Sequence, residues 1–599
     1  MLHKTPLERY QELVSIHTAT LSKYNKRGII FGWLRFITII SAFASLWWLW
    51  TNGFFAFIFL PIILLILFFY ILSKDVNNKE AIKNLLRLVQ INKTEIEVLH
   101  HRFTHLPDGS LYKPGLHEYA NDLDIFGRAS LFQYTNRTNS EQGNKLFSEW
   151  MLDPAPPTII LQRQEAVKEL TQDVQWRQQL QSYGKETPVT ISMQQKIESW
   201  LQQPTQFIYK KKWQLLRFIL PGISFSFLLL HLTGIIPSPF FYALIFLQLI
   251  ISLGISKMVM PAYLQLNKIA SELASLSGSI SWIEKKTFNS NLLKEIKNKY
   301  DTGETPSSAK ITKLRKILDM LDIRLNPLVF IPLNTFFFWD LQQIFSLEKW
   351  KTTNKKSIDD WFTALAEMEC LSSMATLSFN NPEWIFPGIS TSEGIFSAEE
   401  LGHPLIPKDK LINNSFSTEG LNQMNLITGS NMAGKSTFLR SIGVNIVLAM
   451  MGSPVCAKRL TVSPMKIMSS MRVSDNLEES TSTFYAELKK LKEIIDAVYE
   501  NKKAFLLLDE ILRGTNSADR HTGSKALIKQ LIQHKAAGLI ATHDLELAKL
   551  ADEFPGSIHN YHFDVQVAND ELYFDYKLKR GVCQSMNASI LMKKIGIEL

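Results

Sequence analysis

Cysteine is scarce in this sequence, which has only Cys370, Cys456 and Cys583 in its 599 residues. The three lie far apart and none belongs to a C-x-x-C pair, so neither a disulfide framework nor a cysteine zinc site is predicted. We therefore expect the soluble parts of the chain to be cytosolic and reduced.

A strong charge imbalance is also missing. The formal net charge of +9 is modest for this length. It fits contact with nucleic acid or anionic lipid, and it equally fits a membrane protein with basic cytosolic flanks. Solvated basic faces are a plainer interpretation than a dedicated DNA groove, so charge alone selects no partner.

Four long apolar stretches dominate the sequence instead, and they form two pairs. The stretches are Ile29 to Trp50 and Phe54 to Leu72, joined by Thr51-Asn-Gly53, and Phe218 to Ile236 and Phe240 to Val259, joined by Pro237-Ser-Pro239. Buried core helices of a soluble protein are the alternative, but each pair has about 40 residues with almost no polar face. The sequence therefore predicts two transmembrane hairpins.

Basic residues flank these stretches on one side and are absent from the hairpin tips. They are Lys74 and Lys79 after the first pair, and Lys210, Lys211, Lys212, Arg217 and Lys257 around the second. The positive-inside rule then places both termini and all large segments in the cytosol. Arg35 is close enough to the start of its stretch to reach the interface. We expect a multi-pass protein of the cytoplasmic membrane of a bacterium, without a cleaved signal peptide.

The predicted fold class is an α/β P-loop NTPase preceded by an all-α core and lever region, with four transmembrane helices in two hairpins. The expected segments are a basic tail (1–28), hairpin 1 (29–72), a helical core (73–212), hairpin 2 (213–259), a helical lever (260–400) and an ATPase domain (401–599).

A glycine motif follows the predicted strand that ends at Thr428. It reads G-x-x-x-x-G-K-S and is followed by a predicted helix, the context in which this motif binds phosphate. The expected nucleotide contacts are Gly429, Ser430, Asn431, Met432, Ala433, Gly434, Lys435, Ser436 and Thr437. Backbone N–H groups can surround the phosphates of ATP, Lys435 can neutralise them, and the Ser436 hydroxyl can bind Mg²⁺.

Two more apolar strands end in candidate catalytic residues. The run from Ala504 ends in Asp509 and Glu510, and the run from Gly538 ends in His543. Asp509 is expected to hold Mg²⁺ through water, and Glu510 to orient and deprotonate the attacking water. His543 can touch the γ-phosphate or that water, so the predicted catalytic set is Lys435, Glu510 and His543.

With these residues in view, the chain resembles the MutS family of DNA mismatch-repair ATPases. The likeness lies in Thr428 to Arg440 with its Asn431-Met432 pair, in Ser482-Thr-Phe-Tyr-Ala-Glu487, in Leu508 to Asp519, and in Ala541-Thr-His-Asp544. The resemblance implies a homodimer in which Ser482 contacts the ATP of the other subunit. It also implies that His562 packs on the adenine, and that the ligand is mismatched DNA.

The resemblance continues upstream, in segments such as Leu123 to Phe132 and Trp150 to Pro154, which look like the family's helical core. Several departures accompany it. Leu512 stands where a glycine is usual, and the mismatch-reading domain is replaced by the basic tail and the first hairpin. The region 263–361 looks too short for a full DNA clamp, and the terminal helix-turn-helix is expected to be truncated.

Two functional hypotheses remain open. The first is a membrane-anchored MutS-like ATPase that couples ATP hydrolysis to DNA binding, as mismatch repair in the family implies. The second is an ATP-driven mechanical or scaffolding membrane protein that acts on a protein partner without recognising a mismatch. Four spans with almost no charged residue in their interiors favour anchoring over transport.

Overall fold

The computed structural model describes residues 4–52, 59–301, 303, 305–430, 433–471, 483–500, 504–568 and 571–583. Two compact units are present. Unit 1 contains Met1–Arg102 and Gln175–Thr187, and unit 2 contains Phe103–Val174 and Pro188–Leu599.

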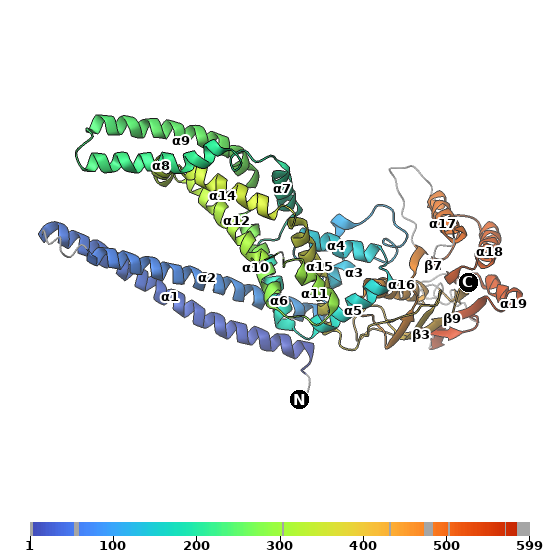
Figure 1. The fold of residues 1–599 in the computed structure, drawn as a ribbon. Coiled ribbons are helices and arrows are strands. Elements are labelled where there is room, and N and C mark those ends of the chain that lie inside the picture. Colours follow the sequence, from blue (N-terminus) through green and yellow to red (C-terminus); the bar gives the residue numbers. More distant parts are fainter. Residues whose placement is uncertain are drawn as a thin grey trace. The chain divides into compact units, whose positions relative to one another are not determined.

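Unit 1 is helical. It is built on two long helices that lie side by side, α1 (Pro6–Asn52) and α2 (Phe59–Leu99), together with most of α6 (Val174–Glu186) (Figure 1). Residues 6–28, which the sequence suggested as a basic tail, form the first turns of α1, where Tyr10 and Leu13 are buried. Arg35 Nη2 lies 3.1 Å from Oδ2 of the buried Asp75. This arginine therefore has a partner carboxylate on the neighbouring helix.

The first part of unit 2 is also helical. Its elements are η2 (Ser110–Tyr112), α3 (Leu131–Thr135), α4 (Glu141–Leu152), α5 (Pro157–Thr171), α7 (Ile191–Gln202), α8 (Lys211–Leu232), α9 (Ser238–Leu266), α10 (Ala270–Lys285), α11 (Asn291–Asn298), α12 (Ser307–Leu321), η3 (Asp322–Leu325), α13 (Pro327–Phe337), α14 (Trp339–Asn354) and α15 (Ile358–Asn380).

Among the described residues, four helices are long and apolar enough to cross a membrane, judged by length and composition. They are α1, α2, α8 and α9, and each overlaps most of one of the four predicted stretches. The first hairpin was expected to turn at Thr51-Asn-Gly53, but Thr51 and Asn52 are the last residues of α1, and Gly53 lies outside the described residues.

The rest of unit 2 is an α/β region with two mixed sheets. Its elements are β1 (Gly388–Ile389), β2 (Phe396–Leu401), β3 (Asn414–Thr418), β4 (Met424–Thr428), α16 (Lys435–Met451), β5 (Arg459–Val462), β6 (Lys466–Ser470), α17 (Thr483–Tyr499), β7 (Ala504–Asp509), α18 (Ser517–Gln533), β8 (Ala537–Thr542), η4 (Leu545–Lys549), α19 (Leu550–Glu553), β9 (Ile558–Ala568) and β10 (Glu571–Arg580). The α/β region thus begins ahead of residue 401, because β2 pairs with β3 and β5.

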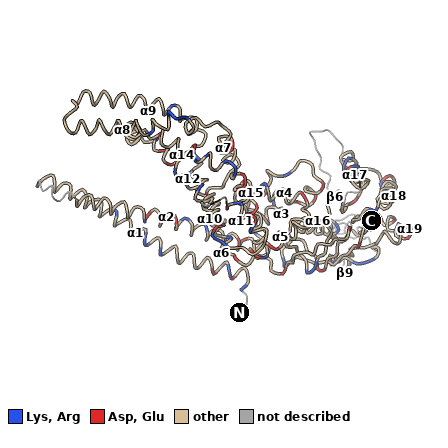
Figure 2. The backbone as a smooth tube through the Cα atoms, in the orientation of Figure 1, with Lys and Arg blue, Asp and Glu red and all other residues tan. Residues whose placement is uncertain are grey.

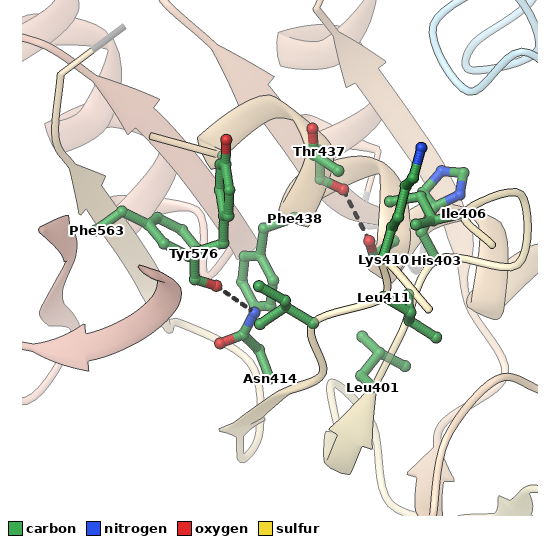
Figure 3. Close-up of a pocket in the computed structure, with 13 residues that line it drawn as sticks. Leu401, His403, Ile406, Lys410, Leu411, Asn414, Thr437, Phe438, Phe563 and Tyr576 are labelled. Atoms are coloured by element: carbon green, nitrogen blue, oxygen red, sulfur yellow. Dashed lines mark hydrogen bonds between the residues drawn. The ribbon is translucent and has the colours of Figure 1, made fainter. Parts of the chain in front are cut away.

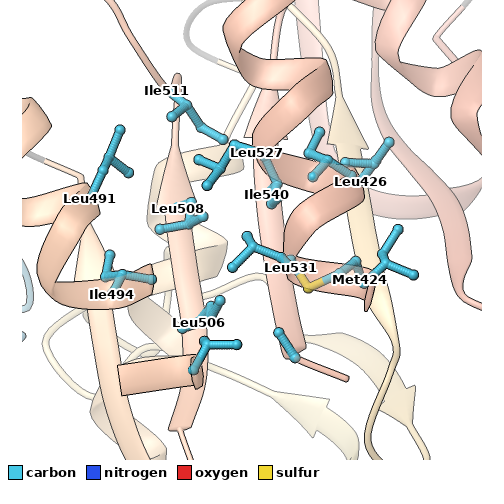
Figure 4. Packing of buried hydrophobic residues seen from close by; sticks show 14 of the residues in the cluster. Met424, Leu426, Leu491, Ile494, Leu506, Leu508, Ile511, Leu527, Leu531 and Ile540 are labelled. Carbon is cyan, nitrogen blue, oxygen red and sulfur yellow. The ribbon is translucent and has the colours of Figure 1, made fainter. Parts of the chain in front are cut away.

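The six-stranded sheet has the order β10-β9-β4-β8-β7-β6 and is parallel except for the β9–β10 pair. Alternation along β7 sends its leucines to opposite faces. Leu506 and Leu508 pack with residues of α17 and α18 (Figure 4), whereas Leu507 faces Gly443 of α16. Because both faces are covered by helices, the central strands β4, β7 and β8 are almost fully buried and mostly apolar. Their carboxyl ends are the accessible edge for polar chemistry.

Candidate functional site

A glycine loop, residues 429–434, connects the buried strand β4 to α16. Gly434 has φ +102°, a left-handed conformation that favours glycine, and a Cβ there would lie 3.0 Å from Tyr576 Cδ1. A Cβ on Gly429 would lie 2.9 Å from the carbonyl oxygen of Phe563. Both glycines are therefore required by the shape of the loop. Asn431 and Met432 lie outside the described residues.

Lys435, the first residue of α16, folds back onto this loop. Its Nζ donates to the carbonyl oxygens of Gly429 at 2.8 Å and Ser430 at 2.9 Å. Burial lowers the pKa of Lys435, although Glu510 and Asp509 oppose this shift. The lysine thus ties the loop together and places an ammonium group at the carboxyl end of the sheet.

Ser436 and Asp509 bring α16 and β7 together. Ser436 Oγ donates to Asp509 Oδ2 at 2.5 Å. Burial raises the pKa of Asp509, and its Oδ1 is buried without a hydrogen-bond partner among the described residues. A buried, unsatisfied carboxylate oxygen is costly unless a cation or a donor completes its shell. Ser436 and Asp509 therefore form a set of oxygen atoms suited to a hard divalent cation.

Glu510 and His543 meet at the same edge. Glu510 Oε1 contacts His543 Nε2, and Glu510 Oε2 accepts from Arg513 Nε at 2.8 Å. The hydrogen bond from His543 lowers the pKa of Glu510, which favours its carboxylate form. His543 Nδ1 lies 2.9 Å from the Gly429 carbonyl oxygen. The ends of β4, β7 and β8, which are adjacent in the sheet, are therefore connected through these side chains.

The backbone after Asp509 is strained. Glu510 has φ 51° and Leu512 has φ 61°, both left-handed and unfavourable for residues with a Cβ. Leu512 is thus a leucine in a conformation that favours glycine. Its N–H donates to Glu487 Oε1 at 2.5 Å, so helix α17 helps to hold this turn. Glu487 was not among the predicted site residues, although it belongs to the Ser482-Thr-Phe-Tyr-Ala-Glu487 motif.

A cavity of about 290 Å³ opens beside the glycine loop. Its lining includes Gly434, Thr437, Phe438, Ser441, Phe563 and Tyr576, together with several residues between Leu401 and Asn414 (Figure 3). A bulge between Phe574 and Leu578 sets the direction of Tyr576, whose φ is 50°. The sequence carries no motif signal for Tyr576.

His562, the predicted adenine contact, is not among the residues that line this cavity. Its Nε2 lies 3.7 Å from Asp564 Oδ1, and its side chain is mostly buried. Its assigned role stays a prediction, as does that of Ser482, which lies outside the described residues.

Two other predicted nucleotide contacts are described. Ala433 is buried in the loop, and the carbonyl oxygen of Thr437 accepts from Ser441 Oγ at 2.8 Å.

The helical region contacts this site through a segment before α3. Asp124 Oδ2 lies 3.2 Å from Arg440 Nη1 on α16, and Asp122 Oδ2 lies 2.6 Å from Lys490 Nζ on α17. Leu123, between them, packs against Gly443, where a Cβ would approach within 2.7 Å. Asp122 and Asp124 thus connect the helical region to α17, which precedes β7, and to α16, which follows the glycine loop.

Comparison with known proteins places the α/β region in a family. Residues 425–595 match the family model described as MutS domain V. The DNA mismatch repair protein MutS of Clostridium botulinum strain Langeland is 35% identical over 226 residues, which cover 36% of this chain and 24% of that protein. The MutS protein of Finegoldia magna is 34% identical over 234 residues, 38% of this chain and 26% of that protein.

The matched segment therefore spans about a quarter of the length of these relatives. It contains the glycine loop, the Asp509–Glu510 pair and His543, whose side chains converge in the structure. Over residues 425–595 the chain therefore carries a MutS domain V, and in this region it is similar to proteins of the MutS family.

Proposed function

We propose that this protein is a membrane-anchored MutS-like ATPase that binds ATP with Mg²⁺ and hydrolyses it to ADP and phosphate. The observation that carries the proposal is the convergence of Lys435, the Ser436–Asp509 pair and the Glu510–His543 pair at the ends of adjacent parallel strands. Ligands of open α/β sheets bind at this edge. The glycine loop acts as a P-loop, whose N–H groups and helix N-terminus receive the phosphates.

The residues present fit a magnesium ion. Ser436 Oγ and the buried Asp509 supply oxygen ligands, and Asp509 Oδ1 has no hydrogen-bond partner among the described residues. When bound, Mg²⁺ supplies charge neutralisation for the phosphates. Lys435 binds the β- and γ-phosphates, and Glu510, held as a carboxylate by His543 and Arg513, accepts the proton of the attacking water.

The cavity beside the loop is the proposed site for the adenine base. Phe438, Phe563 and Tyr576 present aromatic surface to it, and such rings stack on bases. Burial lowers the pKa of His403, also in the wall, to about 4, so its imidazole is neutral near pH 7. His403 therefore adds no positive charge to the wall near pH 7, and the aromatic surface of the cavity favours a base as its occupant.

Membrane anchoring is proposed from α1, α2, α8 and α9. Their side chains include exposed aromatic and aliphatic groups, among them Trp50 at 87% exposure and Leu232 at 75%. Surfaces of this kind are rare in water and ordinary in lipid. The basic flanks of these helices support a cytosolic position for the α/β region.

We further propose a homodimer that engages DNA, with Ser482 contacting the nucleotide of the partner. The names of the matched relatives, DNA mismatch repair proteins, support DNA as the ligand. A protein partner without mismatch recognition is the second candidate, because the match is confined to about a quarter of those relatives. Heteroduplex binding at about 50 mM salt that weakens as salt rises favours DNA, and its absence favours the protein partner.

The catalytic assignment is tested with Glu510→Ala. We expect ATP binding to persist while turnover falls by about two orders of magnitude or more, since a general base contributes on that scale. Glu546→Ala is the matched control, because Glu546 is exposed and pairs only with Lys549 among the ion pairs described. Unchanged hydrolysis by Glu510→Ala would refute the role of this carboxylate.

Membrane anchoring is tested by sedimentation. The proposal is refuted if the chain stays in the supernatant after membranes are sedimented without detergent.

A further inference from the structure

A short apolar helix, α13, lies between α12 and α14 and is not one of the four long candidates. No charged residue occurs from Leu325 to Trp339. The 11 residues of α13 extend about 16 Å, roughly half of a hydrocarbon core of about 30 Å. Leu325 is 73% exposed and Leu328 88% exposed, and Val329, Ile331 and Phe337 are also exposed. A helix with so many exposed apolar side chains is unusual on a surface that faces water.

The neighbours of α13 are the two candidate spans of the second hairpin. The ring of Phe337 lies 5.3 Å from that of Phe225 on α8, and Asn334 Nδ2 donates to the carbonyl oxygen of Ser252 on α9 at 3.4 Å. From Phe218 to Ser256, α8, α9 and their connection carry no Lys, Arg, Asp or Glu (Figure 2). The exposed surface of α13 is therefore continuous with the apolar surface of the hairpin.

The chain reverses direction after α13 through a turn in which the backbone N–H groups of Phe338 and Asp340 are hydrogen-bonded within the protein. Phe338 is fully buried and left-handed, with φ 52°. Its N–H donates to the Asn334 carbonyl oxygen at 3.1 Å, and the Asp340 N–H donates to Asn334 Oδ1 at 3.1 Å. Irregular backbone at membrane depth is tolerated only where protein satisfies it. This turn meets that requirement.

Charged residues occur only at the two ends of the segment, and they neutralise each other. Arg324 Nη2 lies 2.8 Å from Asp340 Oδ1, and Ser256 Oγ donates to Asp340 Oδ2 at 2.5 Å. The Arg324 guanidinium also lies over the ring of Tyr263, 4.4 Å from its centroid. Both ends of the segment are thus tied to the cytosolic half of α9, where a paired charge is tolerated.

We propose that residues 325–339 form a re-entrant membrane element, which enters the cytosolic leaflet beside the second hairpin and contacts lipid acyl chains. The inference rests on the proposed anchoring by that hairpin. The side chains of Leu328, Val329 and Ile331 form the lipid-facing surface, and the buried turn at Phe338 returns the chain to α14. The anchor of unit 2 then has three elements, two that cross the bilayer and one that enters half of it.

Cysteine accessibility tests this inference. Cys370, Cys456 and Cys583 are buried, so the parent chain gives a low background. In the full chain reconstituted into phosphatidylglycerol-containing liposomes, Leu328→Cys should react with a water-soluble maleimide at least tenfold more slowly than Leu111→Cys. Leu111 is a matched control in the same unit, because it is 95% exposed. Leu229→Cys on α8 reports on the hairpin itself.

The outcomes separate the two proposals. Protection of both Leu229→Cys and Leu328→Cys supports the re-entrant element. Protection of Leu229→Cys with fast labelling of Leu328→Cys overturns it and leaves the anchor intact, whereas fast labelling of both overturns the anchor as well. A photoactivatable phospholipid in the same liposomes should crosslink to residues 325–339. Protection without that crosslink would assign the surface to a second copy of the chain and would also overturn the inference.

Discussion

Replacement of Glu487 should impair hydrolysis far more than nucleotide binding. Glu487 is 4% exposed on α17, and its Oε1 accepts from the N–H groups of Leu512 at 2.5 Å and Arg513 at 3.4 Å. These bonds hold a turn in which Glu510 and Leu512 adopt left-handed backbone, at a cost of about 1 to 2 kcal/mol each. The glutamate therefore keeps the proposed general base in position without touching the nucleotide.

The size of the effect follows from the lost acceptor. A buried N–H left without a partner costs about 1 to 3 kcal/mol, and relaxation of the turn would avoid that cost by moving Glu510. We expect Glu487→Ala to lower kcat by about 10- to 100-fold, since 1.4 kcal/mol corresponds to tenfold in rate. The affinity for ATP should change less than about threefold, because Lys435 and the glycine loop are unaltered.

Phosphate release at saturating ATP, together with equilibrium binding of ATP, measures both quantities. Glu487→Gln keeps the Oε1 acceptor and should retain kcat within about threefold of the parent chain. Glu493→Ala, at an exposed position of the same helix, is the control for helix effects. The reasoning is refuted if Glu487→Ala hydrolyses ATP normally, or if the glutamine variant loses as much activity as the alanine variant.

Three further predictions concern the turn, the cavity and the helical core. Leu512→Gly should hydrolyse ATP within about threefold of the parent chain, whereas Leu512→Val, β-branched at φ 61°, should lose at least about tenfold in phosphate release. Tyr576→Ala should raise KM for ATP about tenfold with little change in kcat, and Tyr576→Phe should not; equal effects of the two would contradict stacking. Burial raises the pKa of Glu369 from its ordinary 4.5 to about 7, so the fold favours the neutral acid. The contribution of Glu369 to the free energy of unfolding is then fully present below about pH 4.5, and about 3 kcal/mol is lost as pH rises through about 7. Tm should fall over the same pH range, and Glu369→Gln should flatten that dependence.

The core of the candidate site could be predicted because its residues follow strands. Asp509, Glu510 and His543 come directly after apolar runs, and parallel strands bring such positions to one edge. The sequence also showed that Leu512 stands where the family usually has a glycine. In the structure this leucine has a left-handed backbone conformation, with φ 61°, which glycine adopts more easily.

Other features depend on tertiary structure and carried no sequence signal. Tyr576 reaches the cavity through a bulge, and the cavity wall comes from segments more than a hundred residues apart. The short helix α13 has fewer apolar residues than a membrane span requires, and only its exposure beside α8 and α9 distinguishes it from a core helix. The helical start of α1 depends on the packing of Tyr10 and Leu13, not on the polar composition of residues 6–28.

Hydrolysis by protein that floats with liposomes tests the central claim most directly. The full chain, reconstituted and separated on a density gradient, should release phosphate from ATP in the floated fraction in a Mg²⁺-dependent manner. Lys435→Ala should float equally well and release about 100-fold less phosphate, because it lacks the ammonium group beside the glycine loop. Floated parent chain that fails to hydrolyse ATP, or that is matched by Lys435→Ala, would contradict the account.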